Sequence, residues 1–315
     1  MRVVRSLEEI PREKNAVVTV GTFDGVHLAH QEIIREVVNR TRMREGRSMV
    51  VTFEPHPKEV VRPHGGPVQL LSTMDERVAK IGTLQVDLLW IIHFTYEFSR
   101  LSSQEFYRRY LVEGAGVSEV VVGYDHMFGR DREAGIEALI RMGKEFDFSV
   151  FAVHPYAVAG APVSSTRVRK ALEEGDIAAA NGMLGYPYAM QGIVVRGDGR
   201  GATIGYPTAN IRVASERKVI PARGVYVVGA RAGERQLYGM MNIGVRPTIA
   251  PGNDVSIEVH LLNFSGDLYG ASLEISFLHR LREERKFASV AELIHQLDKD
   301  REESLRVIAA RVEQP

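Results

Sequence analysis

Short apolar segments rich in β-branched residues alternate with helical segments over the first 186 residues. The expected strands are 16–20, 48–54, 87–94, 119–123 and 148–154, and the expected helices lie near 28–44, 74–84, 103–113 and 133–145. Two of these helices open with a capping-box pattern, Thr73 with Glu76 and Ser102 with Glu105. Apolar strands separated by helices favour a parallel sheet covered by helices on both faces. Such a sheet binds its ligands at the carboxyl ends of the strands.

The pattern changes near residue 187, where hairpin-like segments replace the strand–helix alternation. These segments are 189–197, 224–233, 235–244, 254–264 and 272–281. Within 255–261 apolar and polar residues alternate, which is typical of a half-buried antiparallel strand. The series predicts a small barrel or sandwich, followed by a final helix that begins at Ser289. We therefore expect two domains, residues 1–186 and residues 187–315.

Charge and composition exclude several classes of protein. Forty basic residues balance forty acidic ones, so nothing indicates steering toward nucleic acid or an anionic membrane. The chain has no cysteine, which excludes disulfides, thiolate nucleophiles and cysteine-ligated metals. Its charged start does not resemble a secretory segment, and its longest apolar run, 88–92, is far shorter than a membrane span. We expect a soluble cytoplasmic protein.

The segment VTVGTFDGVHLAH, residues 18–30, joins an expected strand to an expected helix. It contains a turn with Gly21, Asp24 and Gly25, and it places His27 and His30 three residues apart. On one helical turn these histidines face the same way, beside free N–H groups that favour an anion. The segment therefore indicates a phosphate site. Two solvated histidines, or a metal site with Asp24 as third ligand, are the alternatives.

A second polar turn, PVSSTRVRK at 162–170, brings hydroxyl groups and cations together. Ser164, Ser165 and Thr166 open a helical pattern, and Arg169 follows within one turn. Hydroxyls, free N–H groups and guanidinium groups suit a polyphosphate. The alternative is an ordinary serine N-cap with solvated arginines. Both polar turns lie at strand-to-helix junctions, and together they favour nucleotide chemistry.

GTFDGVHLAH resembles the signature of the cytidylyltransferase-like nucleotidyltransferases. VTFEPHP at 51–57 and SSTRVR narrow the resemblance to the FMN adenylyltransferase module of prokaryotic bifunctional FAD synthetases. The resemblance implies that His27, His30 and Arg169 act in adenylyl transfer. The implied ATP contacts are Gly21, Phe23, Asp24, Gly25, Asp125, Ser164, Ser165 and Thr166, and the implied flavin contacts are Pro55, His56 and Pro57. Ala29 departs from the pattern, because the family has glycine there.

The glycine-rich segment GDGRGATIGYPTAN, residues 197–210, fits neither a Walker A loop nor a dinucleotide fingerprint. A glycine-rich hairpin explains its glycines, but not Thr208 and Asn210, two oxygen ligands suited to a hard cation. The segment is similar to the riboflavin kinase signature, and 242–249, 258–270 and 281–287 continue the match. The resemblance implies that Thr208 and Asn210 meet Mg²⁺ and ATP, that Gly199 and Gly201 approach ATP, and that Glu258 is the catalytic base. Alternation alone makes Glu258 a solvent-facing residue.

The resemblance covers nearly the whole chain. It implies an α/β nucleotidyltransferase-type, Rossmann-like parallel-sheet domain followed by an antiparallel β-barrel domain with a C-terminal helix. The expected activity is phosphorylation of riboflavin to FMN, then adenylylation of FMN to FAD, with ATP and Mg²⁺ and without nucleic acid or membrane. An adenylyltransferase for another acceptor and a flavin-binding module without catalysis are the rival interpretations. Protein partners are left open.

Overall fold

The computed structural model describes residues 1–13, 15–61, 68–124, 135–197, 199–245 and 255–312. The chain forms two compact units, Met1–Ser165 and Thr166–Pro315. The domain boundary predicted at 186/187 lies just before the first barrel strand, and as a domain boundary it stays a prediction. In the described parts of the chain, no helix combines the length and the apolar character that a membrane crossing needs.

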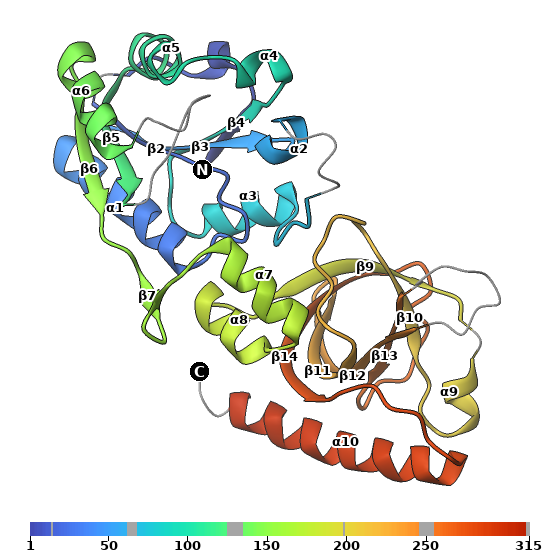
Figure 1. Cartoon of the computed structure of the whole chain (residues 1–315). Helices are drawn as coiled ribbons and strands as arrows, with labels where there is room; N and C mark the ends of the chain where they lie inside the picture. Colours follow the sequence, from blue (N-terminus) through green and yellow to red (C-terminus); the bar gives the residue numbers. More distant parts are fainter. Residues whose placement is uncertain (14, 62–67, 125–134, 198, 246–254, 313–315) are drawn as a thin grey trace. The chain divides into compact units, whose positions relative to one another are not determined.

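The first unit is built on a six-stranded parallel sheet with the order β1-β4-β3-β2-β5-β6 (Figure 1). Its strands are β1 (Arg2–Val4), β2 (Ala16–Val20), β3 (Ser48–Glu54), β4 (Leu88–His93), β5 (Val117–Gly123) and β6 (Ser149–Val153). A separate two-stranded hairpin pairs β7 (Ala157–Val158) with β8 (Ala161–Pro162). The predicted parallel sheet is confirmed, with β1 as an additional edge strand.

Helices cover both faces of this sheet. They are η1 (Leu7–Glu9), α1 (Leu28–Arg44), α2 (Pro57–Val61), α3 (Met74–Gly82), α4 (Tyr96–Ser99), α5 (Ser103–Glu105), the π-helical η3 (Phe106–Ala115) and α6 (Ile136–Phe146). Ile34 and Val38 of α1 and Ile81 of α3 pack against one face. On the other face, η3 and α6 contribute Leu111 and Leu139 to a second core cluster. Burial of these apolar faces is the main source of stability for such a layered unit.

The direction of the chain through the sheet changes at β2. The chain passes from β2 to β3 and then β4 on one side, and it returns to β5 and β6 on the other. The carboxyl ends of β2 and β5 are therefore neighbours at the switch point, where open α/β sheets bind their ligands. The segment that follows β2 is the polar turn predicted to bind phosphate.

The second unit contains a closed antiparallel barrel with the order β10-β13-β12-β11-β14-β9 (Figure 1). Its strands are β9 (Ala189–Val195), β10 (Ala209–Val213), β11 (Gly224–Ala232), β12 (Arg235–Val245), β13 (Val255–Leu261) and β14 (Ser272–Arg282). The inward residues Ile257, Val259 and Leu261 of β13 are buried and the outward ones are half-buried, which matches the predicted alternation; Val255, at the start of the strand, is exposed. The structure selects the barrel over the sandwich.

Four helices accompany the barrel: α7 (Ser165–Glu174), α8 (Ile177–Leu184), α9 (Arg200–Thr203) and α10 (Val290–Val312). The predicted C-terminal helix is thus confirmed. It is tied to β14 by Arg282, whose Nη2 donates to Oδ2 of the buried Asp300 over 2.7 Å and whose Nε donates to Oδ1 over 3.1 Å. Gln296 also donates to Oδ1 of Asp300 over 2.7 Å. This bidentate pair gives α10 a defined register on the barrel.

Candidate active sites

The turn between β2 and α1, residues 21–27, is held in an uncommon backbone conformation. Phe23 and Val26 have φ angles of 47° and 36°, in a region that side chains of this size rarely adopt. The N–H of Gly21 donates to the carbonyl of Val51 on β3 over 3.0 Å, and the N–H of Val26 donates to the carbonyl of Phe23 over 3.0 Å. Such backbone strain persists only where the surroundings enforce it, as at ligand sites.

Asp24 anchors this turn to the segment that precedes α3. Its side chain is 1% exposed and accepts hydrogen bonds from the N–H of Leu71 over 3.0 Å and from the N–H of Ser72 over 2.9 Å. The hydroxyl of Ser72 donates to Asp24 over 3.1 Å and accepts from the N–H of Gly25 over 2.9 Å. The carboxylate of Asp24 is therefore engaged inside the protein. Its predicted contact with ATP stays a prediction.

A buried arginine, Arg77 on α3, lies beneath the same turn. Its Nη2 lies 3.7 Å from Oδ1 of Asp24, and its Nη1 lies 3.5 Å from the hydroxyl of Thr52. Thr52 in turn donates to the carbonyl of Thr22 over 3.1 Å. Burial lowers the pKa of Arg77, and the charge of Asp24 opposes that shift. Sequence reasoning missed Arg77, although its position four residues before the buried Ile81 marks it as an inward-facing charge.

His27 and His30 lie together at the start of α1. His27 is the N-cap, and its Nδ1 accepts a hydrogen bond from the N–H of His30 over 3.4 Å. From this bond we infer that the neutral His27 ring carries its proton on Nε2. The two rings are stacked, with centroids 3.6 Å apart and planes 16° apart. Phe23 contacts His30 edge-on, with centroids 5.1 Å apart.

The environment of His30 favours its neutral form. The residue is half-buried, but its Nδ1 is fully buried without a hydrogen-bond partner. Burial holds the pKa of His30 well below 6.5, and the nearby positive charge of Arg77 lowers it further. A neutral imidazole at a helix N-terminus offers hydrogen bonds to a phosphate rather than a full charge. Among the described residues, no group of three His, Cys, Asp or Glu side chains could hold a metal ion, so the zinc interpretation has no support.

The second polar turn meets the first at Ser165. The hydroxyl of Ser165, the first residue of α7, donates to the backbone carbonyl of Asp24 over 3.0 Å. The structure thus joins two segments that the sequence places 141 residues apart. Thr166 and Arg169 belong to the second compact unit, and their contacts with ATP stay predictions, as does that of Ser164. Asp125 lies outside the described residues.

The predicted flavin-contacting segment follows β3, the strand beside β2. His56 is 9% exposed, and its Nδ1 accepts a hydrogen bond from the N–H of Lys58 over 3.1 Å. As for His27, this bond favours a proton on Nε2. Pro55 and Pro57 flank it, and Pro57 begins the short helix α2. These three residues lie at the carboxyl ends of the strands, the same edge of the sheet as the turn 21–27 that is predicted to bind phosphate. Their contact with flavin stays a prediction.

In the second unit the structure brings the predicted kinase residues together on the outer face of the barrel. The hydroxyl of Thr208 donates to Oε2 of Glu258 over 3.2 Å. Asn210 lies directly opposite Glu258 in the ladder between β10 and β13. Directly opposite residues point to the same face of a sheet. Glu258 is therefore the centre of a polar cluster rather than an isolated solvent-facing residue.

Two further residues of this cluster were not predicted. Asn242 on β12 lies directly opposite Glu258 on its other side, so the row runs Asn210, Glu258, Asn242 across three strands. Ser256 donates its hydroxyl to Oε1 of Glu258 over 3.0 Å. The strict alternation in 255–261 already places Ser256 and Glu258 on one face and could have identified Ser256. Asn242 depends on the strand register, which the sequence does not reveal.

The glycine-rich segment 197–205 makes room for these side chains. A Cβ atom at Gly197 would overlap the side-chain amide of Asn210. A Cβ atom at Gly201 would overlap the carbonyl of Tyr206 and would lie 3.3 Å from the hydroxyl of Thr208. Gly199 has open space around it, but its φ of 68° favours glycine. In this segment, Gly197 and Gly201 therefore allow neighbouring groups to approach the backbone closely, and Gly199 allows a backbone conformation that favours glycine.

Tyr206 fixes the position of the residues that lead into β10. Its hydroxyl donates to Asp298 of α10, and its ring packs with Met240 and Leu262. Burial and the bond to Asp298 raise the pKa of Tyr206 to about 12, so it stays protonated near neutral pH. The neighbouring carbonyl of Pro207 lies 2.8 Å from Nδ1 of His260. The segment that carries Thr208 is thus held in place by contacts with both α10 and β13.

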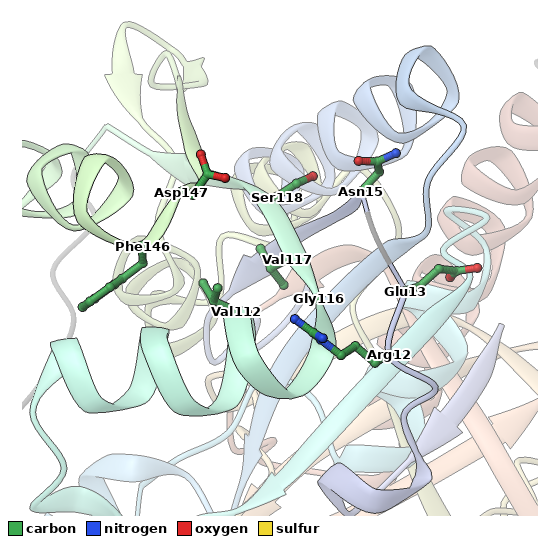
Figure 2. Close-up of a pocket in the computed structure, with 9 residues that line it drawn as sticks. All are labelled: Arg12, Glu13, Asn15, Val112, Gly116, Val117, Ser118, Phe146 and Asp147. Carbon is green, nitrogen blue, oxygen red and sulfur yellow. The ribbon is translucent and has the colours of Figure 1, made fainter.

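The first unit also contains a hollow of about 450 Å³ (Figure 2). Arg12, Glu13, Asn15, Val117 and Asp147 are among the residues that line it. Because β5 begins at Val117 and β2 at Ala16, the hollow lies at the amino ends of the strands. This edge of the sheet is opposite to the turn 21–27 that is predicted to bind phosphate. We therefore do not assign the hollow to the candidate active site of the first unit.

The two units define an enzyme class that combines a nucleotidyltransferase-like domain with a kinase-like barrel. The family model described as FAD synthetase matches residues 9–167, and the model described as riboflavin kinase matches residues 184–308. The chain belongs to the family of bifunctional riboflavin kinase/FMN adenylyltransferases. A relative from Listeria monocytogenes with that name is 39% identical over 299 residues, which cover 95% of this chain and 94% of the relative.

Two further relatives extend this finding. The bifunctional riboflavin kinase/FMN adenylyltransferase of Escherichia coli is 36% identical over 301 residues, covering 95% of each chain. A crystal structure from Streptococcus pneumoniae, described as that of a macrolide-efflux protein, matches with a TM-score of 0.87 and 32% identity. The match covers 96% of this chain and 97% of that protein. The fold of the first unit and that of the barrel therefore occur in one chain elsewhere.

Proposed function

We propose that this chain makes FAD from riboflavin in two ATP-dependent steps in the cytoplasm, with a separate active site for each step. The second unit phosphorylates riboflavin to FMN, and the first unit adenylylates FMN to FAD. The observation that carries the proposal is the hydrogen bond from Thr208 to Glu258, because it unites two motifs of the riboflavin kinase signature on one face. The matched family models and the relatives support both activities.

In the kinase step a neutral primary hydroxyl of riboflavin must become a nucleophile. Glu258 accepts its proton while the hydroxyl oxygen forms a bond to the γ-phosphorus of ATP. The bond from that phosphorus to the β–γ bridging oxygen breaks, and ADP leaves with the electron pair. Thr208 orients the carboxylate through the hydroxyl hydrogen that it donates. The glycines of 197–205 allow the backbone to approach the phosphates.

The donor set beside Glu258 fits magnesium. Thr208 and Asn210 offer a hydroxyl and an amide oxygen, which are hard ligands of the type that Mg²⁺ prefers. Both side chains face the same cluster, since Thr208 contacts Glu258 and Asn210 lies opposite it. When bound with ATP, the ion neutralises charge on the phosphates. We propose that Thr208 and Asn210 hold it.

Adenylyl transfer to FMN has different requirements. The phosphate of FMN is already anionic, so no strong base is needed. One of its oxygens forms a bond to the α-phosphorus of ATP, the bond to the α–β bridging oxygen breaks, and pyrophosphate leaves. His27 and His30 donate hydrogen bonds to the phosphates at the N-terminus of α1, and Arg169 neutralises charge on them. Pro55, His56 and Pro57 contact the flavin.

A time course with the purified chain, riboflavin, ATP and Mg²⁺ tests this proposal. Chromatography should separate FMN first and then FAD, with ADP released in the first step and pyrophosphate in the second. Absence of FMN would contradict the kinase assignment, and FMN without FAD would contradict the adenylyltransferase assignment. Nicotinate mononucleotide and pantetheine phosphate serve as acceptor controls, and neither should be adenylylated. Product from either control would favour the rival interpretation.

A further inference from the structure

Ser256 contacts the proposed catalytic base directly, yet neither motif analysis nor the reaction scheme requires a residue there. It lies two positions before Glu258 on β13, so both side chains project from the outer face of the barrel. Its hydroxyl donates to Oε1 of Glu258 over 3.0 Å. Both residues are half-buried, where a hydrogen bond to a carboxylate is stronger than in open solvent.

The two oxygens of Glu258 are held from two directions. Oε1 accepts from Ser256, along the same strand, and Oε2 accepts from Thr208, which precedes the neighbouring strand β10. A carboxylate held by one donor alone can rotate about its terminal bond, which has a broad torsional preference. Two donors define the plane of the carboxylate, and they thereby define the direction in which the remaining lone pairs point.

The residue directly across the ladder from Ser256 offers no side-chain partner of its own, and the carboxylate of Glu284 lies where the Cβ atom of that residue would be. In the ladder between β12 and β13, Ser256 lies opposite Gly244, which has no side chain to offer as a partner. The next pair along the ladder is Asn242 with Glu258. Thr208 also has a proposed role as a ligand of magnesium. Ser256 therefore contributes the orienting hydrogen bond that is independent of the metal.

We propose that Ser256 is a positioning residue for the riboflavin kinase reaction, which fixes the carboxylate of Glu258 for proton acceptance. This inference rests on the proposed function of Glu258 as the base. Ser256 acts through Glu258 and touches neither ATP nor riboflavin in this scheme. Its loss should therefore lower kcat and leave KM for both substrates nearly unchanged.

A pair of isosteric variants separates the hydroxyl from the shape of the side chain. Ser256→Thr keeps the hydroxyl, and Ser256→Val matches threonine in size without it; both are β-branched and suit a strand. We expect kcat of the kinase step to fall about 10-fold to 100-fold in Ser256→Val, the range of one hydrogen bond to a charged group. Ser256→Thr should retain most of the activity. FAD formation from supplied FMN serves as the control for the first unit, and an unfolding curve of each variant serves as the control for an intact barrel.

Several outcomes would overturn the proposal. They are wild-type kcat in Ser256→Val, equal loss in both variants, and a raised KM with unchanged kcat. A double variant adds a sharper test, because Ser256→Val should cost nothing further once Glu258→Gln is present. Retained FMN synthesis in Glu258→Gln alone would refute the proposed base, and the role of Ser256 with it. An inactive Glu258→Gln beside a fully active Ser256→Val would refute the role of Ser256 alone.

Discussion

His27 caps helix α1 by accepting a hydrogen bond from the N–H of His30, and the two imidazole rings are stacked with their centroids 3.6 Å apart. The bond requires an unprotonated Nδ1 on His27, and burial keeps His30 neutral. The start of α1 therefore presents two neutral rings to a ligand. In the adenylyl transfer that we propose, their contribution would be directed hydrogen bonds at a helix N-terminus.

Replacement of His30 by alanine should impair one reaction and spare the other. We expect FAD formation from FMN to fall by about 10²–10³, the loss typical of one transition-state contact. FMN formation from riboflavin should be almost unchanged, because the kinase residues lie in the other compact unit. Steady-state assays of each step, with unfolding curves for both proteins, provide the measurement. Equal loss of both activities at unchanged stability would contradict separate sites, and recovery on adding zinc would revive the metal interpretation.

The stability of the first unit should depend on pH through His30. Its pKa is held well below 6.5 in the folded protein, so the unfolded chain takes up a proton first as the pH falls. The stabilisation is thus complete above the unfolded value and is lost as the pH falls toward the folded one, at no more than about 1.4 kcal/mol per pH unit. Urea unfolding at several pH values should show this slope in the wild type and a smaller one in His30→Gln. Identical slopes would contradict the buried, neutral His30.

Removal of the carboxylate of Asp24 should destabilise the first unit. Asp24 and Arg77 are 1% and 3% exposed, so Asp24→Asn leaves a buried cation without its anion. Breaking such a pair costs about 3–5 kcal/mol. Asp75→Asn is the matched control, because Asp75 is exposed on the same helix as Arg77. Chemical unfolding measures both variants, and a loss below about 0.5 kcal/mol for Asp24→Asn, the size of an ordinary surface effect, would refute the anchoring role.

A methyl group at Gly197 should disturb the kinase site alone. It would overlap the amide of Asn210, and relieving such overpacking costs about 1–3 kcal/mol. We expect Gly197→Ala to lower riboflavin phosphorylation about 5-fold to 100-fold, if that cost falls on the active arrangement of Asn210. Gly182→Ala in α8 is the control, because a Cβ atom there has open space. Unchanged kinetics in Gly197→Ala would show that Asn210 can move aside without loss.

The sequence pattern predicts most elements of both units because their hydrophobic periodicity is strong. Expected strands 16–20 and 48–54 match β2 and β3, and expected helix 28–44 matches α1. The sequence pattern misses β1 and β10, which are strands of 3 and 5 residues. Unlike the five-residue β2, which is AVVTV, the strands β1 (RVV) and β10 (ANIRV) each include an arginine and lack a run of apolar residues. Non-local pairing supplies their stability. For β10 that pairing is with β9 and β13, which closes the barrel.

The sequence predicts which residues belong to the candidate sites, but it does not predict which of them contact one another. Motifs identify Thr208 and Glu258, yet 50 residues separate them and no local pattern shows that they share a hydrogen bond. Alternation describes Glu258 as solvent-facing, whereas it is half-buried because the segment carrying Thr208 covers it. Arg77 was missed for a related reason. Its role depends on its ion pair with Asp24, a residue that is distant in the sequence but adjacent in space.

The central claim is that Glu258 serves the kinase step and no other, and Glu258→Gln tests it most directly. The substitution keeps the shape of a half-buried side chain but removes its capacity to accept a proton. We expect FMN synthesis from riboflavin to fall by about 10²–10⁴, the contribution of a general base. The same preparation, given FMN and ATP, should form FAD at nearly the wild-type rate. Undiminished FMN synthesis, or parallel loss of FAD synthesis in a folded variant, would contradict the account.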